Sequence, residues 1–175
     1  AVSDPTDNFA RSQMLLASTY AGIGFGNAGV HLPHGMSYPV AGMVKEFVPN
    51  GFPRPEANTE PIIPHGMSVI LNAPAVFRFT ATANPKLHLL AASLMGVNIQ
   101  EVPVDQAGQV LAEAIVNLMK ATNMPNGLSA VGYELADIPK LVHGTLPQHR
   151  VTKLSPRLAE EKVLTQLFED SMVCW

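Results

Sequence analysis

The sequence predicts an all-α fold, and three observations support this. Apolar residues recur at helical spacing through residues 105–120, which is the strongest periodic run in the chain. Asn84-Pro85 and Ser155-Pro156 each place a helix-starting pair before another such run. No strand-like alternation of comparable strength is present. At 175 residues the chain is the size of one domain, so a single helical domain over residues 1–175 is expected.

The first two clear helices are expected at residues 9–20 and 84–96. Residues 9–20 form the first, and Asp7 or Asn8 can accept hydrogen bonds from its free amide groups. Residues 84–96 hold the second, which starts at the Asn-Pro pair and stops near the glycine. The second helix carries Leu87, Leu90, Ala91 and Leu94.

Three further helices are expected in the C-terminal half. The run at residues 105–120 has a wide apolar stripe on one face, a short helix over 137–144 can be capped by Asp137, and Ser155-Pro156 opens the last helix. The stripe consists of Ala107, Val110, Leu111, Ala114, Ile115, Leu118 and Met119. The buried face of the last helix is expected to consist of Leu158, Val163, Leu164, Leu167, Phe168 and Met172.

Two segments are predicted to be non-helical. Residues 48–64 contain five prolines and an Asn-Gly pair, which is typical of a long surface loop. Such a loop is either functional or a tolerated insertion. Residues 144–155 form a polar connection that carries His149, Arg150 and Lys153.

Composition limits the classes of function. Hydrophobic residues make up 47% of the chain and charged residues only 14%, which suggests that part of the surface meets another domain or subunit. A net charge of −3 without a basic cluster gives no support for a nucleic-acid partner. The single cysteine, Cys174, excludes a disulfide framework or a thiolate zinc cluster. No apolar stretch is long enough to span a bilayer.

The chain begins Ala-Val-Ser-Asp-Pro, with no initiator Met and no recognisable targeting segment. We therefore expect it to be a piece of a longer protein.

Two short histidine motifs are the most informative feature. Leu32-Pro-His34-Gly-Met36 and Ile63-Pro-His65-Gly-Met67 each place Pro before the imidazole and Gly after it. Pro restricts the backbone and Gly permits close approach, so each imidazole is expected at a constrained and open chain reversal. Two such motifs in one small domain suggest one shared site.

The two histidines need not bind a metal, because a single His is more often a hydrogen-bonded core or surface residue. Two imidazoles also leave a divalent ion without its usual three or more protein ligands. Pro33 places the first motif at a helix start or in a loop, so His31 and His34 need not point the same way. His88 is expected in helix packing or a surface hydrogen bond, and His143 at a helix end.

Other candidate residues have comparable alternatives. Tyr38 follows His34 by four positions and either brings a phenol to the same site or anchors the loop. Arg150 and Lys153 either bind a substrate carboxylate or belong to a solvated basic loop. The glycine-rich residues 22–29 are not a dinucleotide-binding turn, since a helix precedes them; close helix packing is the better interpretation.

Residues 21–40 (AGIGFGNAGVHLPHGMSYPV) and the later Pro-His-Gly at 64–66 resemble the iron-containing alcohol dehydrogenase family. Within that family they are most similar to the hydroxyacid-oxoacid transhydrogenase branch. Supporting similarity lies at residues 72–77, 127–133, 136–139 and 144–154. The resemblance makes metal binding by His34 and His65 the favoured interpretation.

The resemblance implies a two-domain fold related to dehydroquinate synthase. An N-terminal α/β domain, absent from this chain, would bind most of the NAD, and the helical C-terminal domain would hold the metal. The metal is usually Fe²⁺, and the ligand types also suit Zn²⁺. His34 and His65 match the third and fourth ligands, while an Asp and a first His would lie upstream.

The implied activity is a transhydrogenase of mitochondria that passes hydride from 4-hydroxybutyrate to 2-oxoglutarate through tightly bound NAD. Tyr38 stands where most alcohol dehydrogenases of the family have another His near the nicotinamide, as expected of that branch. An ordinary NAD-dependent alcohol dehydrogenase and a non-catalytic helical interaction module are the alternatives. The chain alone is expected to be inactive, and a homodimer is left open.

Overall fold

The computed structural model describes residues 1–52 and 60–175, and every regular element in these ranges is a helix. The expected all-α fold is thereby confirmed for this part of the chain. The described chain divides into two compact units, Ala1–Val30 and His31–Trp175. The single domain over residues 1–175 stays a prediction. None of the described helices is long and apolar enough to cross a membrane.

The first unit consists of α1 (Asn8–Ala28) and its flanking residues. The Asp7 carboxylate caps the helix by accepting a 2.9 Å hydrogen bond from the Ala10 amide, as predicted. The helix continues eight residues beyond the expected Tyr20 because its glycines tolerate helical geometry at a modest cost. It ends at Ala28, and the φ of 75° at the next residue, Gly29, lies in the region that favours glycine. The glycine-rich segment is thus helical, which agrees with the rejection of a dinucleotide-binding turn.

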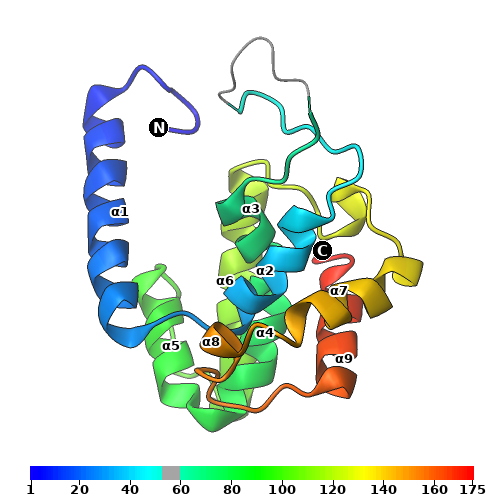
Figure 1. The fold of residues 1–175 in the computed structure, drawn as a ribbon. Coiled ribbons are helices and arrows are strands. Elements are labelled where there is room, and N and C mark those ends of the chain that lie inside the picture. Colours follow the sequence, from blue (N-terminus) through cyan, green and yellow to red (C-terminus); the bar gives the residue numbers. More distant parts are fainter. Residues whose placement is uncertain (53–59) are drawn as a thin grey trace. The chain divides into compact units, whose positions relative to one another are not determined.

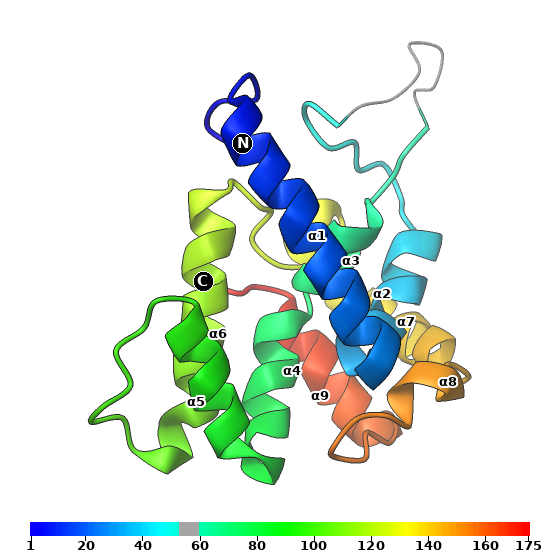
Figure 2. The same cartoon turned by 90° about the vertical axis from the view of Figure 1, so that its left-hand side faces the viewer.

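The second unit contains eight α-helices among its described residues, and Figures 1 and 2 show them as one bundle. They are α2 (Leu32–Gly42), α3 (His65–Ile70), α4 (Ala73–Thr80), α5 (Pro85–Leu94), α6 (Ala107–Ala121), α7 (Ile138–Thr145), α8 (His149–Thr152) and α9 (Glu161–Ser171). Single 3-10 turns lie at Ala81–Ala83, Val104–Gln106, Ser129–Val131 and Leu135–Asp137. Packing runs from α5 through α6, α4, α9 and α7 to α2, and α2 also contacts α3 and α8.

One hydrophobic core connects these helices. Its largest fully buried side chains are Leu32, Met36, Leu71, Met119, Leu128, Leu141, Leu164 and Phe168. The predicted stripe on α6 is largely confirmed, with Leu111, Ile115 and Met119 in the core, although Leu118 is exposed. Since α2 and α3 contribute to this core, the two helices that carry the histidine motifs are held by it.

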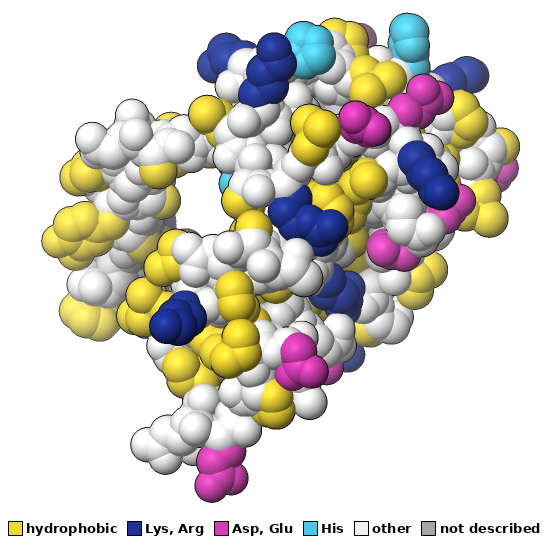
Figure 3. Space-filling model, turned by 90° about the horizontal axis from the view of Figure 1, so that it is seen from below, with side chains coloured by type: hydrophobic (Ala, Val, Ile, Leu, Met, Phe, Trp, Pro, Cys, Tyr) yellow, Lys and Arg dark blue, Asp and Glu magenta, His cyan; other side chains and the backbone are white. Residues whose placement is uncertain are grey.

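Helix α5 begins at Pro85 with the Asn84 side chain accepting from the Leu87 amide, as predicted. It buries His88, Leu89 and Ala92, so helix packing by His88 is confirmed. The leucines at the other helical register, Leu87, Leu90 and Leu94, are exposed, the last by 80%. Figure 3 likewise shows hydrophobic side chains exposed among scattered charged ones on one face.

The expected start of the last helix at Ser155 is wrong, since α9 begins at Glu161. The Arg157 guanidinium donates a 2.5 Å hydrogen bond to the Phe79 carbonyl and stacks 4.0 Å from the Phe79 ring centroid. These contacts keep the preceding segment out of a helix, and Leu158 is 73% exposed rather than buried. The distant α4 therefore overrides the local Ser-Pro signal.

The connection expected over residues 144–155 is partly helical, because α7 continues to Thr145 and α8 follows. Val151 of α8 is only 3% exposed, so burial against α2 stabilises a turn that local sequence does not favour. Asp137 precedes α7 as expected but does not cap it with its side chain. The carboxylate instead accepts from the Glu134 amide and pairs with Lys45 at 2.5 Å.

The buried Tyr133 hydroxyl donates a 2.7 Å hydrogen bond to the Val40 carbonyl near the end of α2, and burial raises the pKa of Tyr133 to about 12. Tyr133→Phe leaves that carbonyl without its partner, so we expect the free energy of unfolding to fall by about 1–3 kcal/mol. Urea denaturation followed by circular dichroism measures this. Tyr20→Phe on exposed α1 is the control and should leave stability unchanged; an equal loss in both variants would contradict the assignment.

Lys45 holds the pKa of Asp137 below its ordinary value of 3.8, and the Glu134 amide adds to this effect. A carboxyl whose pKa is lower in the folded state stabilises the fold above its unfolded pKa. That stabilisation is lost as pH falls from about 4 through the folded pKa. Asp137→Asn should therefore flatten the dependence of stability on pH below about 4, measured by denaturation at stepped pH. A dependence equal to that of the unmodified chain would refute the role of the Lys45 pair.

Candidate metal centre

The two histidine motifs adopt the same local structure at the starts of two helices. His34 lies in the first turn of α2, and His65 is the first residue of α3. In each motif a serine three residues later donates its hydroxyl to the histidine carbonyl, Ser37 at 2.7 Å and Ser68 at 2.8 Å. The expected chain reversals are therefore helix starts, which the prolines favour because a missing amide costs nothing there.

The structure brings the two imidazoles together, with ring centroids 5.3 Å apart and ring planes tilted by 56°. Two imidazoles that share one ion through nitrogens about 2.1 Å from it have centroids about 5 Å apart. Among the described contacts, none of the ring nitrogens of His34 and His65 has a hydrogen-bond partner. Each imidazole therefore has a lone pair free for a cation. The pair therefore fits a divalent cation in spacing and in chemistry.

Burial also favours the metal-binding form of one of these imidazoles. Partial burial lowers the pKa of His34, and the neighbouring His65 lowers it further. Burial lowers the pKa of His31 as well, with smaller contributions from His34 and His88. A lowered pKa keeps an imidazole neutral at physiological pH, and only the neutral form has a lone pair to donate.

The glycines of the two motifs have different environments, which corrects the expectation that both leave room for a ligand. A Cβ built on Gly35 would lie 2.7 Å from Thr152 Cγ2 and 3.4 Å from Val151 Cγ2. Gly35 thus allows α8 to approach α2. A Cβ on Gly66 meets nothing within 4 Å, so only the second motif is open in the expected way.

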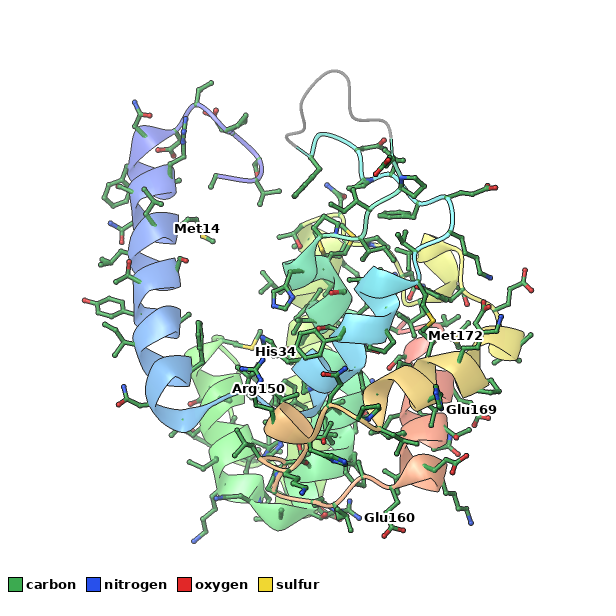
Figure 4. All side chains as sticks on the ribbon, in the orientation of Figure 1. Met14, His34, Arg150, Glu160, Glu169 and Met172 are labelled. Carbon is green, nitrogen blue, oxygen red and sulfur yellow. The ribbon has the colours of Figure 1, made fainter. Side chains whose placement is uncertain are left out.

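Arg150 lies beside the same helix as His34. Its Nη2 donates a 3.4 Å hydrogen bond to the Tyr38 hydroxyl, and Tyr38 stands one helical turn after His34. Figure 4 labels His34 on α2 and Arg150 on α8. The structure therefore brings His34, Tyr38 and Arg150 into one region.

Lys153 directly follows α8, three positions after Arg150. It lines a pocket of about 250 Å³ whose walls include His149, Glu160 and Glu161. Of the two cations that the sequence singled out, Arg150 has a hydrogen bond to a residue of α2, whereas Lys153 lines this pocket. Among residues 1–52 and 60–175, no group of three or more His, Cys, Asp and Glu side chains is arranged to hold a metal ion.

Sequence reasoning missed the two serines and assigned no role to His31. Ser37 and Ser68 occupy the same position in an identical five-residue sequence, Pro-His-Gly-Met-Ser, so extending the comparison of the motifs by one residue would have found them. The role of His31 depends on ring contacts with α4, and no sequence signal indicates them.

Comparison with known proteins defines the class of protein. The family model described as Fe-containing alcohol dehydrogenase family, C-terminal, matches residues 1–46 and 59–172. The chain belongs to this family.

Its curated relatives include the "Probable hydroxyacid-oxoacid transhydrogenase, mitochondrial" of Dictyostelium discoideum, 55% identical over 99% of this chain and 31% of that protein. The mitochondrial hydroxyacid-oxoacid transhydrogenase of Rattus norvegicus is 53% identical over 98% of this chain and 36% of its own length. The chain thus spans about a third of the curated relatives that it matches.

Solved structures agree on the fold. A 1,3-propanediol oxidoreductase superposes with a TM-score of 0.79 at 25% identity, over 95% of this chain and 39% of that one. An alcohol dehydrogenase from Oenococcus oeni superposes with a TM-score of 0.80 at 20% identity, over 94% of this chain and 38% of its own. The helical fold is therefore that of the C-terminal part of iron-type alcohol dehydrogenases.

Gly35→Ala places a methyl group against Thr152, so α8 or α2 must shift. We expect a loss of about 1–3 kcal/mol in the free energy of unfolding, typical of overpacking. Gly66→Ala is a matched control in the twin motif and should leave stability unchanged or raise it by up to about 1 kcal/mol. Equal losses in the two variants, measured by urea denaturation, would show that the contact with α8 is not the cause.

Proposed function

We propose that this chain is the metal-binding helical part of a metal- and NAD-dependent oxidoreductase. In this proposal His34 and His65 bind one divalent cation, Fe²⁺ in the first place and Zn²⁺ as an alternative. The observation that carries it is the 5.3 Å separation of two imidazoles with free ring nitrogens, each at the start of a helix. Further ligands and most of the NAD site would come from residues outside this chain.

The names of the relatives support the kind of reaction, a transfer of hydride from a hydroxyacid to an oxoacid in mitochondria. The donor we propose is 4-hydroxybutyrate and the acceptor 2-oxoglutarate, with NAD retained between the two half-reactions. When bound, the cation supplies Lewis acidity that makes an alcohol a better hydride donor. The protein residues hold the cation and orient the substrate.

Arg150 is the residue we propose for the substrate carboxylate. Its guanidinium is exposed and presents paired donors that match a carboxylate. The Tyr38 hydroxyl accepts from one of those donors and so orients the guanidinium beside the helix of His34. Lys153 is the second candidate, and its pocket beside Glu160 and Glu161 makes it less suited to an anion.

Metal binding is tested on the chain itself by titration with Zn²⁺, followed by calorimetry. We expect saturable binding that is lost in the double variant His34→Ala/His65→Ala. His143→Ala, at an exposed position of α7, is the control and should bind like the unmodified chain. Affinity equal to that of the double variant would favour a non-catalytic helical interaction module.

The reaction is tested on the full-length protein. With 4-hydroxybutyrate and 2-oxoglutarate together, 2-hydroxyglutarate should form, and with 4-hydroxybutyrate alone no free NADH should accumulate. Accumulation of NADH would instead indicate an ordinary NAD-dependent alcohol dehydrogenase. Arg150→Met should raise KM for the hydroxyacid about tenfold to a hundredfold, since a hydrogen bond to a charged group is lost. A larger effect in Lys153→Met would reverse the assignment.

A further inference from the structure

A row of three aromatic rings leads from α5 to the start of α2. The ring of His88 on α5 contacts Phe77 on α4, and Phe77 contacts His31, the residue that precedes α2. We infer that His88 is a positioning residue for the metal ligand His34 and acts through Phe77 and His31. This inference rests on the proposed metal site.

His88 is held firmly enough to act as the fixed end of this row. It is only 8% exposed, and both of its ring nitrogens have partners. Nδ1 lies 2.9 Å from the Asn84 carbonyl, which can only accept, so this nitrogen donates. Nε2 lies 3.0 Å from the Thr80 hydroxyl at the end of α4. The ring is therefore fixed to the two helices that it joins.

The contacts along the row have the edge-to-face geometry that aromatic pairs prefer. The centroids of His88 and Phe77 are 5.9 Å apart with planes at 73°, and those of Phe77 and His31 are 6.1 Å apart with planes at 88°. A rotation or retreat of His88 would remove the support that its ring gives to the Phe77 ring. Phe77 would then be free to follow, since protein interiors tolerate few voids.

The backbone of His31 connects the ring contacts to the metal ligand His34. Its carbonyl accepts a 2.9 Å hydrogen bond from the His34 amide and a 3.1 Å bond from the Gly35 amide. Its side chain makes no capping hydrogen bond, and its Nδ1 is buried without a partner among the described residues. Among the described contacts, ring packing against Phe77 rather than a hydrogen bond therefore positions the His31 side chain, next to the first turn of α2.

The central experiment compares Zn²⁺ affinity of the 175-residue chain and its variants by calorimetry. His88→Ala is expected to bind about tenfold more weakly, because residues that orient metal ligands have effects of this order. The matched control is His143→Ala, which also removes one imidazole but from an exposed position, and should bind as the unmodified chain does. Unchanged affinity in a folded His88→Ala variant would overturn the inference.

A spectroscopic readout separates positioning from general stability. With Co²⁺ at saturation, the visible absorption bands report the geometry of the bound imidazoles. We expect these bands to shift in His88→Ala but not in His143→Ala, and identical spectra would overturn the inference.

Thr80→Val serves where His88→Ala does not fold. It keeps the volume of a buried side chain and removes only the hydroxyl that meets His88 Nε2. We expect a fall in Zn²⁺ affinity of about threefold, and no change would overturn the inference. Failure of the unmodified chain to bind more Zn²⁺ than His34→Ala/His65→Ala would instead overturn the proposed metal site itself. The two failures are thus distinguishable.

Discussion

The packing of α2 is the constraint on which the candidate site depends. Leu32, Met36 and Val40 on one side of this helix are fully buried. This burial fixes the rotation of the helix, and so fixes His34 and Tyr38 on a different side of it. Two close approaches maintain that packing. Gly35 admits α8, and a Cβ on Gly144 of α7 would lie 2.7 Å from Pro39 Cβ. Small residues at these crossings bring Arg150 on α8 to Tyr38, although 112 positions separate them in the chain.

The repeated Pro-His-Gly-Met-Ser sequence adopts the same local structure in two different packing environments. In both copies the proline favours a helix start, and the serine hydroxyl donates to the histidine carbonyl. The backbone around the two histidines is therefore similar. Their glycines then serve different purposes, close packing of α8 at Gly35 and open space at Gly66. Because α2 and α3 pack against each other, the two imidazoles lie side by side.

Much of the fold was predictable because its signals are local. The cap at Asp7, the Asn84 start of α5 and the apolar stripe of α6 each depend on neighbouring residues, and each is confirmed. The two wrong predictions, for residues 144–155 and for the start of the last helix, share a different cause. Arg157 is bound to Phe79, and α8 is stabilised through its contact at Gly35, so distant partners decide both segments. The pairing of His34 with His65 was anticipated from the repeated motif, whereas the link from Arg150 to Tyr38 required the tertiary structure. Residues 53–59 of the expected loop lie outside the described residues.

We propose that His34 and His65 bind the same ion. The most direct measurement is anomalous X-ray diffraction from crystals of the chain soaked with Zn²⁺, collected above and below the zinc absorption edge. We expect one strong anomalous peak about 2.1 Å from a ring nitrogen of each of the two residues. Zinc found only at other positions, such as beside His149 and Glu160, or bound by one of the two imidazoles without the other, would contradict it.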